Sequence, residues 1–208
     1  MITTKKLQFS YNDLQHFIFP EITCDSGETL LITGNSGKGK TTLLHLLGGL
    51  LTPDSGEIII DTNDISKLRA AKLDAFRGKN IGMILQKSYF VEALTVLDNV
   101  VLASWLATGK KAKDKATKLL IQLGLENQLN KLPAQLSIGQ QQRVNIARAV
   151  INNPKVILAD EPTSSLDDEN ATIVANLLSN LAKEYQAALI IVTHDQRLKN
   201  QFKNAINL

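Results

Sequence analysis

Several features that would indicate a class of function are scarce in this sequence of 208 residues. It has a single cysteine, Cys24, so a disulfide within the chain is impossible, and a reducing compartment is the simpler assumption. The balance of 23 basic against 20 acidic residues is too even to argue for a nucleic-acid partner or a membrane surface. We interpret the lysines clustered between residues 110 and 118 as a solvated helix face.

Long hydrophobic runs are missing too. The longest apolar stretches lie around 43–51 and 187–192, well short of the about 20 residues that cross a bilayer. The N-terminus places Lys5 and Lys6 ahead of polar residues, where a signal peptide needs an apolar run. We therefore expect a cytoplasmic protein that reaches the cytoplasmic face of the cell membrane only through a partner.

Internal repeats, low-complexity segments and proline- or serine-rich linkers are not found. A chain of this length fits one domain with a substantial core, so we expect a single domain over 1–208.

The most informative stretch is a glycine-rich loop between an apolar strand, 29–33, and a helix that begins near Lys40. It matches the phosphate loop, or Walker A motif. Its glycines let successive backbone N–H groups surround a polyphosphate at the positive end of a helix. Lys40 is expected to reach the β- and γ-phosphates, and the Thr41 hydroxyl to hold Mg²⁺. The loop reads Gly34-Asn35-Ser36-Gly37-Lys38-Gly39-Lys40-Thr41-Thr42.

Three further apolar strands end in polar residues that suit a nucleotide site. The strand 156–159 leads directly into Asp160 and Glu161, the strand after Ala187 ends at His194, and a third ends at Gln86. In a parallel sheet covered on both faces, strands are continuously apolar and the ligand crevice lies at their carboxyl ends. Two adjacent acids there are costly unless a cation meets them, which indicates a Mg²⁺-dependent nucleoside triphosphatase. For His194 a phosphate contact is favoured over a structural hydrogen bond.

The rest of the chain divides into an N-terminal strand-rich part and a helical insertion. Alternating residues predict a strand pair over 5–11 and 17–24. Tyr11 ends the first strand, where the residues alone leave surface packing and a binding role equally open. No strand-like run occurs between 87 and 135, and Trp105 is expected in the core there. The predicted helices cover 42–51, 95–107, 112–123, a segment from the N-cap Ser137 to about 152, and 167–185.

The order of these motifs resembles the nucleotide-binding subunit of an ATP-binding cassette (ABC) transporter over essentially the whole chain. The signature that other phosphate-loop ATPases lack is represented by Leu136-Ser137-Ile138-Gly139-Gln140. The phosphate loop and Gln86 precede this signature along the chain. After it come His194 and, before that histidine, the run Ala159-Asp160-Glu161-Pro162-Thr163-Ser164-Ser165-Leu166-Asp167.

The resemblance implies ATP and Mg²⁺ as ligands and a role for each matching residue. Tyr11 would stack on adenine. Thr41, Gln86 and Asp160 would hold Mg²⁺, and Glu161 would polarise the attacking water. Gln86 would also touch this water and lie beside the surface that contacts the transmembrane subunit. His194 would contact the γ-phosphate, while Ser137, Gly139 and Gln140 would meet the ATP bound to another copy. Asp167 would belong to the loop between the two sites.

For assembly, the resemblance implies a homodimer with two ATP molecules at its interface and a separate transmembrane permease. The fold it implies is α/β: a phosphate-loop NTPase core with a mostly parallel sheet, an N-terminal antiparallel β subdomain and an inserted helical subdomain. The core subdomain would cover about 1–86 and 154–208, and the helical subdomain about 87–153.

Within the family, the runs 43–50 and 94–100 are similar to the subgroup that serves lipoprotein release, macrolide export and cell division, which favours export or extrusion. Ile138, where the family usually has glycine, and Lys38, where a small residue is usual, depart from the pattern. The segment after His194 is short, so no regulatory extension is expected. The alternative is a soluble ABC ATPase of an assembly complex without a permease.

Overall fold

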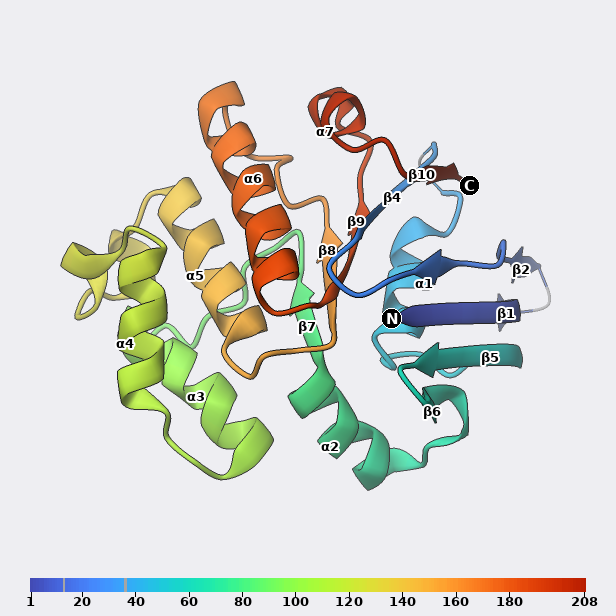
Figure 1. Cartoon of the computed structure of the whole chain (residues 1–208), viewed down its shortest axis with the longest axis horizontal. Coiled ribbons are helices and arrows are strands. Elements are labelled where there is room, and N and C mark those ends of the chain that lie inside the picture. Colours follow the sequence, from blue (N-terminus) through green and yellow to red (C-terminus); the bar gives the residue numbers. More distant parts are fainter. Residues whose placement is uncertain (13, 36) are drawn as a thin grey trace.

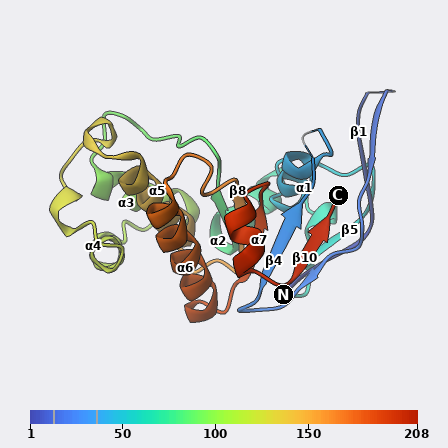
Figure 2. The same cartoon turned by 90° about the horizontal axis from the view of Figure 1, so that it is seen from above.

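The computed structural model describes residues 1–12, 14–35 and 37–208. Two β-sheets and a group of helices make up the fold (Figure 1). The antiparallel sheet and α1 lie at one end of the molecule and α3, α4 and α5 at the other, with the parallel sheet between them (Figures 1 and 2). Within the described ranges, no helix has the length and apolar character needed to span a membrane.

The central sheet is parallel and has the strand order β10-β4-β9-β8-β7. Every residue of β8 and β9 is buried, as the continuously apolar strands predicted. The predicted strand 29–33 is confirmed, and β8 extends one residue beyond its predicted end, to Asp160. The bounds are β4 Thr29–Thr33, β7 Ile81–Ile84, β8 Val156–Asp160, β9 Ala188–Val192 and β10 Ala205–Asn207.

The second sheet is antiparallel, with the order β2-β1-β5-β6 and β3 paired to β1. The predicted N-terminal strand pair is present, but its second strand is split around Pro20. Proline has no N–H group to donate to a ladder, so it interrupts the pairing. The bounds are β1 Ile2–Asn12, β2 Gln15–Ile18, β3 Thr23–Cys24, β5 Ser55–Ile60 and β6 Asn63–Asp64.

Seven α-helices are described along the chain. The predicted helices at 95–107, 112–123 and 167–185 are confirmed within one or two residues, and Ser137 caps α5 as expected. The bounds are α1 Lys40–Leu47, α2 Ala70–Asn80, α3 Val96–Thr108, α4 Lys113–Gln122, α5 Ile138–Val150, α6 Asp168–Glu184 and α7 Gln196–Gln201; the short 3₁₀ helices are η1 Ile65–Lys67, η2 Glu126–Gln128 and η3 Pro133–Gln135.

Two hydrophobic cores lie on opposite faces of the parallel sheet. Because side chains alternate along a strand, Leu189 and Ile191 join one core and Ala188, Ile190 and Val192 the other. The first core contains the buried faces of α3 to α6, and the second contains α1 and the antiparallel sheet. The sheet therefore joins the helical part to the strand-rich part.

The structure corrects the prediction for Trp105. Trp105 is 47% exposed, because it lies at the edge of the buried face of α3, which is centred on Val100, and the next residue, Leu106, is 72% exposed. Two helices, α2 and α7, and the strand β10 were not predicted. α2 has no fully buried residue, so it lacks the apolar period by which a helix is recognised.

The contact between β7 and α5 generates a stability prediction at Gly82. A Cβ on this residue would lie 2.4 Å from the backbone oxygen of Ala149. Since the extra methyl group would meet the backbone of the packed helix α5 and not a flexible side chain, we expect Gly82→Ala to lower the free energy of unfolding by about 1–3 kcal/mol. Denaturant unfolding measures the change.

Gly78→Ala is the matched control. Its Cβ would be 3.2 Å from the Ala107 Cβ, and alanine favours the helix, so a much smaller change is expected. Equal unfolding midpoints and slopes for Gly82→Ala and the wild type would contradict the close approach.

Candidate functional site

The glycine-rich loop joins β4 to α1, as predicted. Gly39 precedes α1 with φ +85°, and a Cβ there would lie 2.6 Å from the Phe17 ring. Glycine is therefore required at this position for both backbone and steric reasons. The Lys40 ammonium group donates to the backbone oxygens of Gly34 and Asn35 at 2.9 and 3.0 Å. The lysine is thus held at the loop where a polyphosphate is expected.

Two predicted loop residues have a limited description. Ser36 lies outside the described residues. Lys38 donates its backbone N–H to Asn35 O at 3.4 Å, and its side chain is exposed. Lys38 is not among the described residues that line the cavity introduced below.

A carboxylate and a hydroxyl meet at the end of β8. The Thr41 Oγ1 atom donates to Asp160 Oδ2 at 3.1 Å, and Asp160 is 7% exposed. Burial raises the pKa of Asp160 above its usual value, and the neighbouring Glu161 charge raises it further, while the Thr41 hydrogen bond opposes both. A cation at these oxygens would offset the cost of the buried charge.

Glu161 is held tightly by the loop that follows β9. Its carboxylate accepts from Thr193 Oγ1 at 2.8 Å and from the His194 backbone N–H at 3.1 Å, and its Oε1 atom lies 2.6 Å from His194 Nδ1. The Glu161 side chain is 10% exposed, against 72% for His194. Glu161 also has φ 47°, an unusual conformation for a residue with a side chain. The predicted base and the predicted histidine are therefore direct neighbours.

Aromatic residues of the N-terminal hairpin border the other side of the phosphate loop. Tyr11 is 51% exposed, and its hydroxyl lies 3.3 Å from Thr42 Oγ1. Its ring makes edge contacts with Phe9 and Phe17 at centroid distances of 4.8 and 6.2 Å. An exposed ring face supported from behind can stack on a planar ligand.

These residues enclose a cavity of about 630 Å³, within the range of ligand-binding clefts. The phosphate loop, both acids, Gln86 and His194 are all part of its wall. Gln15 and Phe17 also line it and were missed by the sequence analysis, because their place depends on the pairing of β2 with β1. The lining residues are Tyr11, Gln15, Phe17, Gly34, Asn35, Gly37, Gly39, Lys40, Thr41, Thr42, Gln86, Asp160, Glu161 and His194.

The remaining predicted site residues, Ser137, Gly139 and Gln140, do not line this cavity. They form the first turn of α5, where Ser137 and Gln140 cap each other through both backbone N–H groups at 3.1 and 3.3 Å. A Cβ on Gly139 would lie 3.1 Å from Asn170 Oδ1 of α6. Ile138 is 60% exposed beside them. The first turn of α5 is thus a separate surface.

Comparison with known families matches residues 20–164 to the family described as ABC transporter. This chain belongs to that family. The matched range includes the phosphate loop, the first turn of α5, and Asp160 and Glu161 at the end of β8, and the predicted ABC ATPase activity is confirmed as the activity of the family.

Relatives of this ABC ATPase support the predicted subgroup. It is 44% identical over 183 residues to the lipoprotein-releasing system ATP-binding protein LolD 2 of Chlorobaculum tepidum, covering 85% of this chain and 74% of that protein. It is 40% identical over 210 residues to LolD of Idiomarina loihiensis, covering 98% and 92%. The predicted similarity to the lipoprotein-release proteins is confirmed.

Solved structures confirm the predicted fold class of the ABC ATPase. The dimeric structure of MJ0796, a bacterial ABC transporter cassette, has a TM-score of 0.88 and 34% identity, covering 100% of this chain and 94% of the other. A post-hydrolysis state of MJ0796 bound to ADP and Pi has the same TM-score and 33% identity, with the same coverage of both chains.

The exposed ring of Tyr11 generates a prediction for nucleotide binding. Tyr11→Ala should weaken ATP and GTP binding alike, by about 1 kcal/mol or roughly fivefold in Kd, because a stack has little base specificity. Titration with fluorescent nucleotide analogues measures both affinities.

Tyr11→Phe is the matched control, since it keeps the ring and removes only the contact with Thr42. Lys40→Ala supplies the reference for lost phosphate binding. If Tyr11→Ala binds both nucleotides with wild-type affinity, the stacking role is wrong and Tyr11 is a packing residue.

Proposed function

We propose that this ABC ATPase is the nucleotide-binding subunit of a transporter, and that two copies close around two Mg·ATP to drive a separate membrane permease. The observation that supports this most directly is the cavity that brings Lys40, Thr41, Asp160 and Glu161 together, while the first turn of α5 lies on another surface of the chain. One copy then holds two half-sites, and a second copy is needed to complete each.

In the proposed site, the phosphate loop and Lys40 bind the β- and γ-phosphates, and Tyr11 stacks on adenine. Thr41 and Asp160, already joined at 3.1 Å, hold Mg²⁺ together with Gln86. One hydroxyl, one carboxylate and an amide oxygen suit an ion that completes its shell with phosphate and water. When bound, Mg²⁺ neutralises charge that develops on the phosphates.

Glu161 and His194 carry the proposed chemistry. Glu161 accepts a proton from the attacking water as the water approaches the γ-phosphate. Thr193 and the His194 N–H orient its carboxylate through hydrogen bonds of 2.8 and 3.1 Å. The largely exposed His194 ring extends to the γ-phosphate, so the residue that positions the base also contacts the reacting group.

In the second copy, Ser137 and Gly139 contact the γ-phosphate and Gln140 keeps Ser137 in place. The N-terminus of α5 supplies backbone N–H groups for an anion. Ile138 adds an apolar side chain to this contact, and Lys38 adds a positive charge beside the phosphate loop. The dimeric state of MJ0796 supports this arrangement.

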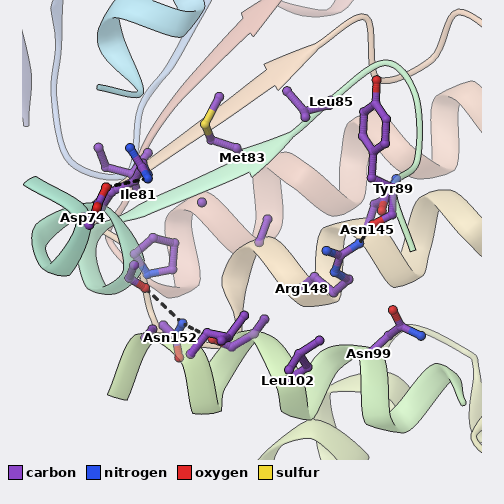
Figure 3. Close-up of a pocket in the computed structure, with 18 of the residues that line it drawn as sticks. Asp74, Ile81, Met83, Leu85, Tyr89, Asn99, Leu102, Asn145, Arg148 and Asn152 are labelled. Carbon is purple, nitrogen blue, oxygen red and sulfur yellow. Dashed lines mark hydrogen bonds and ion pairs between the residues drawn. The ribbon is translucent and has the colours of Figure 1, made fainter. Parts of the chain in front are cut away.

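A second cavity, of about 460 Å³, is the proposed docking groove for the permease. Figure 3 shows it between β7 and α3, with Arg148 of α5 and Tyr89 at one end and Asp74 at the other. Leu85 and Lys87 line this groove, and Gln86 between them lines the nucleotide cavity. A permease segment bound in this groove would therefore contact the two sequence neighbours of Gln86, which itself lines the ATP site.

We propose that the subunit lies on the cytoplasmic face of the cell membrane, held there by the permease. The LolD relatives are named for lipoprotein release, which favours an exporter or extrusion system. We also propose that the single domain is divided into a core subdomain over 1–86 and 154–208 and a helical subdomain over 87–153. The groove between β7 and α3 supports this division, as does the lack of strands between Ile84 and Val156 in that fully described stretch.

The first prediction of this proposal concerns the base and the dimer. Glu161→Gln keeps the shape of the side chain and removes its basicity, so hydrolysis should slow by about 10²–10⁴-fold while ATP still binds. ATP should then persist between two copies. Size exclusion at high protein concentration should give a dimer with ATP and a monomer with ADP.

Ser137→Ala in the Glu161→Gln background is the matched control and should reduce the ATP-dependent dimer. A wild-type rate of hydrolysis in Glu161→Gln would rule out the base assignment. A monomer saturated with ATP would rule out the two-copy site.

The second prediction concerns the groove. Leu106 is 72% exposed and lines it, so Leu106→Glu should place a charge against an apolar partner surface and abolish co-purification with the permease. ATP binding by the isolated subunit should not change.

Ile121→Glu is the control, because Ile121 is 51% exposed on α4 and is not part of the groove wall. Equal recovery of the permease with both variants would argue against this docking surface. Co-purification with a soluble scaffold instead of a membrane protein would support the assembly-type alternative.

A further inference from the structure

Arg197 joins the two loops that carry the acids and the histidine of the site. It follows β9 by a few residues, at the beginning of α7, and pairs with Asp195 beside His194. Its Nε atom donates to both oxygens of Asp195, at 2.9 and 3.0 Å, and its Nη2 atom to Oδ2 at 2.7 Å. The fork geometry of the guanidinium group makes this pair strongly directional.

The same guanidinium group crosses to the loop that follows β8. Its Nη1 atom donates to Leu166 O at 3.2 Å and to Asp168 Oδ1 at 2.7 Å, and its Nη2 atom donates to Thr163 O at 3.3 Å. The Thr163 hydroxyl completes the connection by donating to Asp195 Oδ2 at 2.7 Å. One side chain therefore holds the loop after β9 against the loop after β8.

The segment held in this way begins beside Glu161 and ends at Asp167. Ser164 donates from both its backbone N–H and its hydroxyl to Glu161 O, so the turn after the acid is continuous with the residues that Arg197 contacts. Asp167 caps α6 and belongs to the stretch expected between the two ATP sites. The segment held by Arg197 therefore connects the proposed base, Glu161, with the proposed contact to the second copy at Asp167.

Removing Arg197 would leave a costly charge. The Asp195 side chain is 11% exposed, and its hydrogen bonds to Arg197 lower its pKa to about 2. Without the guanidinium group, this carboxylate keeps the Thr163 hydroxyl and the backbone N–H of residue 197 as donors but loses its opposite charge. We expect the two loops to separate there while the sheet remains intact.

We propose that Arg197 is a positioning residue for ATP hydrolysis, which sets the place of Glu161 relative to His194 and the place of the 163–167 segment at the dimer interface. Arg197 is not part of the nucleotide cavity, so it acts through these loops and not on the substrate. The inference concerns the ATPase activity; its second part rests on the proposed two-copy arrangement.

The kinetic test compares Arg197→Ala with the wild type. Since small displacements of catalytic groups are costly, kcat should fall by roughly 10- to 100-fold, while KM for ATP should stay within about twofold. Arg197→Lys should also lose activity, although less, because an ammonium group can pair with Asp195 but cannot reproduce the fork to both carbonyls.

Asp168→Asn is the matched control. Asp168 is 93% exposed, so its loss removes one surface contact of Arg197 and should leave kcat within about twofold. A wild-type kcat in Arg197→Ala overturns the proposal, as does a raised KM with kcat unchanged. If Arg197→Ala does not fold, the same comparison is made with Arg197→Lys, where a wild-type kcat again overturns it.

The dimer test separates this inference from the proposed function. Glu161→Gln should dimerise with ATP, whereas Glu161→Gln/Arg197→Ala should dimerise less at equal nucleotide occupancy. If Glu161→Gln itself stays monomeric, the two-copy proposal fails and the kinetic comparison still decides the role of Arg197. Equal dimerisation of both variants overturns the interface part of the role.

Discussion

The parallel pairing of β4, β9 and β8 is the constraint on which the site depends. In the register of this sheet, Ile32 lies beside Val192, and Val192 lies beside Asp160. The three strands therefore end at the same level, on the same edge of the sheet. The phosphate loop, the His194 loop and the acid pair come from distant parts of the sequence, and this register alone makes them neighbours.

Backbone hydrogen bonds continue this alignment beyond the strands. Glu161 donates its N–H to Val192 O at 2.8 Å, and Thr193 donates to Ile32 O at 3.0 Å. Glu161 can then adopt its left-handed conformation because the sheet holds it on one side and Thr193 and His194 hold its carboxylate on the other. Unusual backbone conformations persist where the surroundings impose them, and they concentrate at functional positions.

The two hydrophobic cores explain how one sheet can serve two surfaces. The strands contribute alternate residues to each core, so the antiparallel sheet with Tyr11 and the helices around the docking groove are anchored to the same strands. Gln86 follows the end of β7 by two residues and lies between the nucleotide cavity and the groove. A movement of the groove wall would reach the ATP site through a single short connection, which is the physical basis for coupling in the proposed transporter.

The sequence by itself determined the features that depend on local patterns. The phosphate loop is recognised from nine consecutive residues, because its function depends on the local backbone. The buried strands 29–33, 156–159 and 188–192 are recognised as continuous apolar runs. Their polar ends indicated the acids and the histidine, and a capping serine marked the beginning of α5. The family resemblance added the roles that these patterns cannot supply.

Only the tertiary structure decided which residues meet across the chain. Phe17 and Gln15 reach the nucleotide cavity through the register of a hairpin, and Arg197 contacts residues of another loop that lie 29 to 34 positions before it along the chain. The short strand β10 and the half-buried helix α2 have no distinctive period, because their stability comes from packing against the sheet and α3. The prediction that Trp105 lies in the core was wrong because it rested on residue type alone. The orientation of α3 in the packed structure leaves this side chain partly exposed.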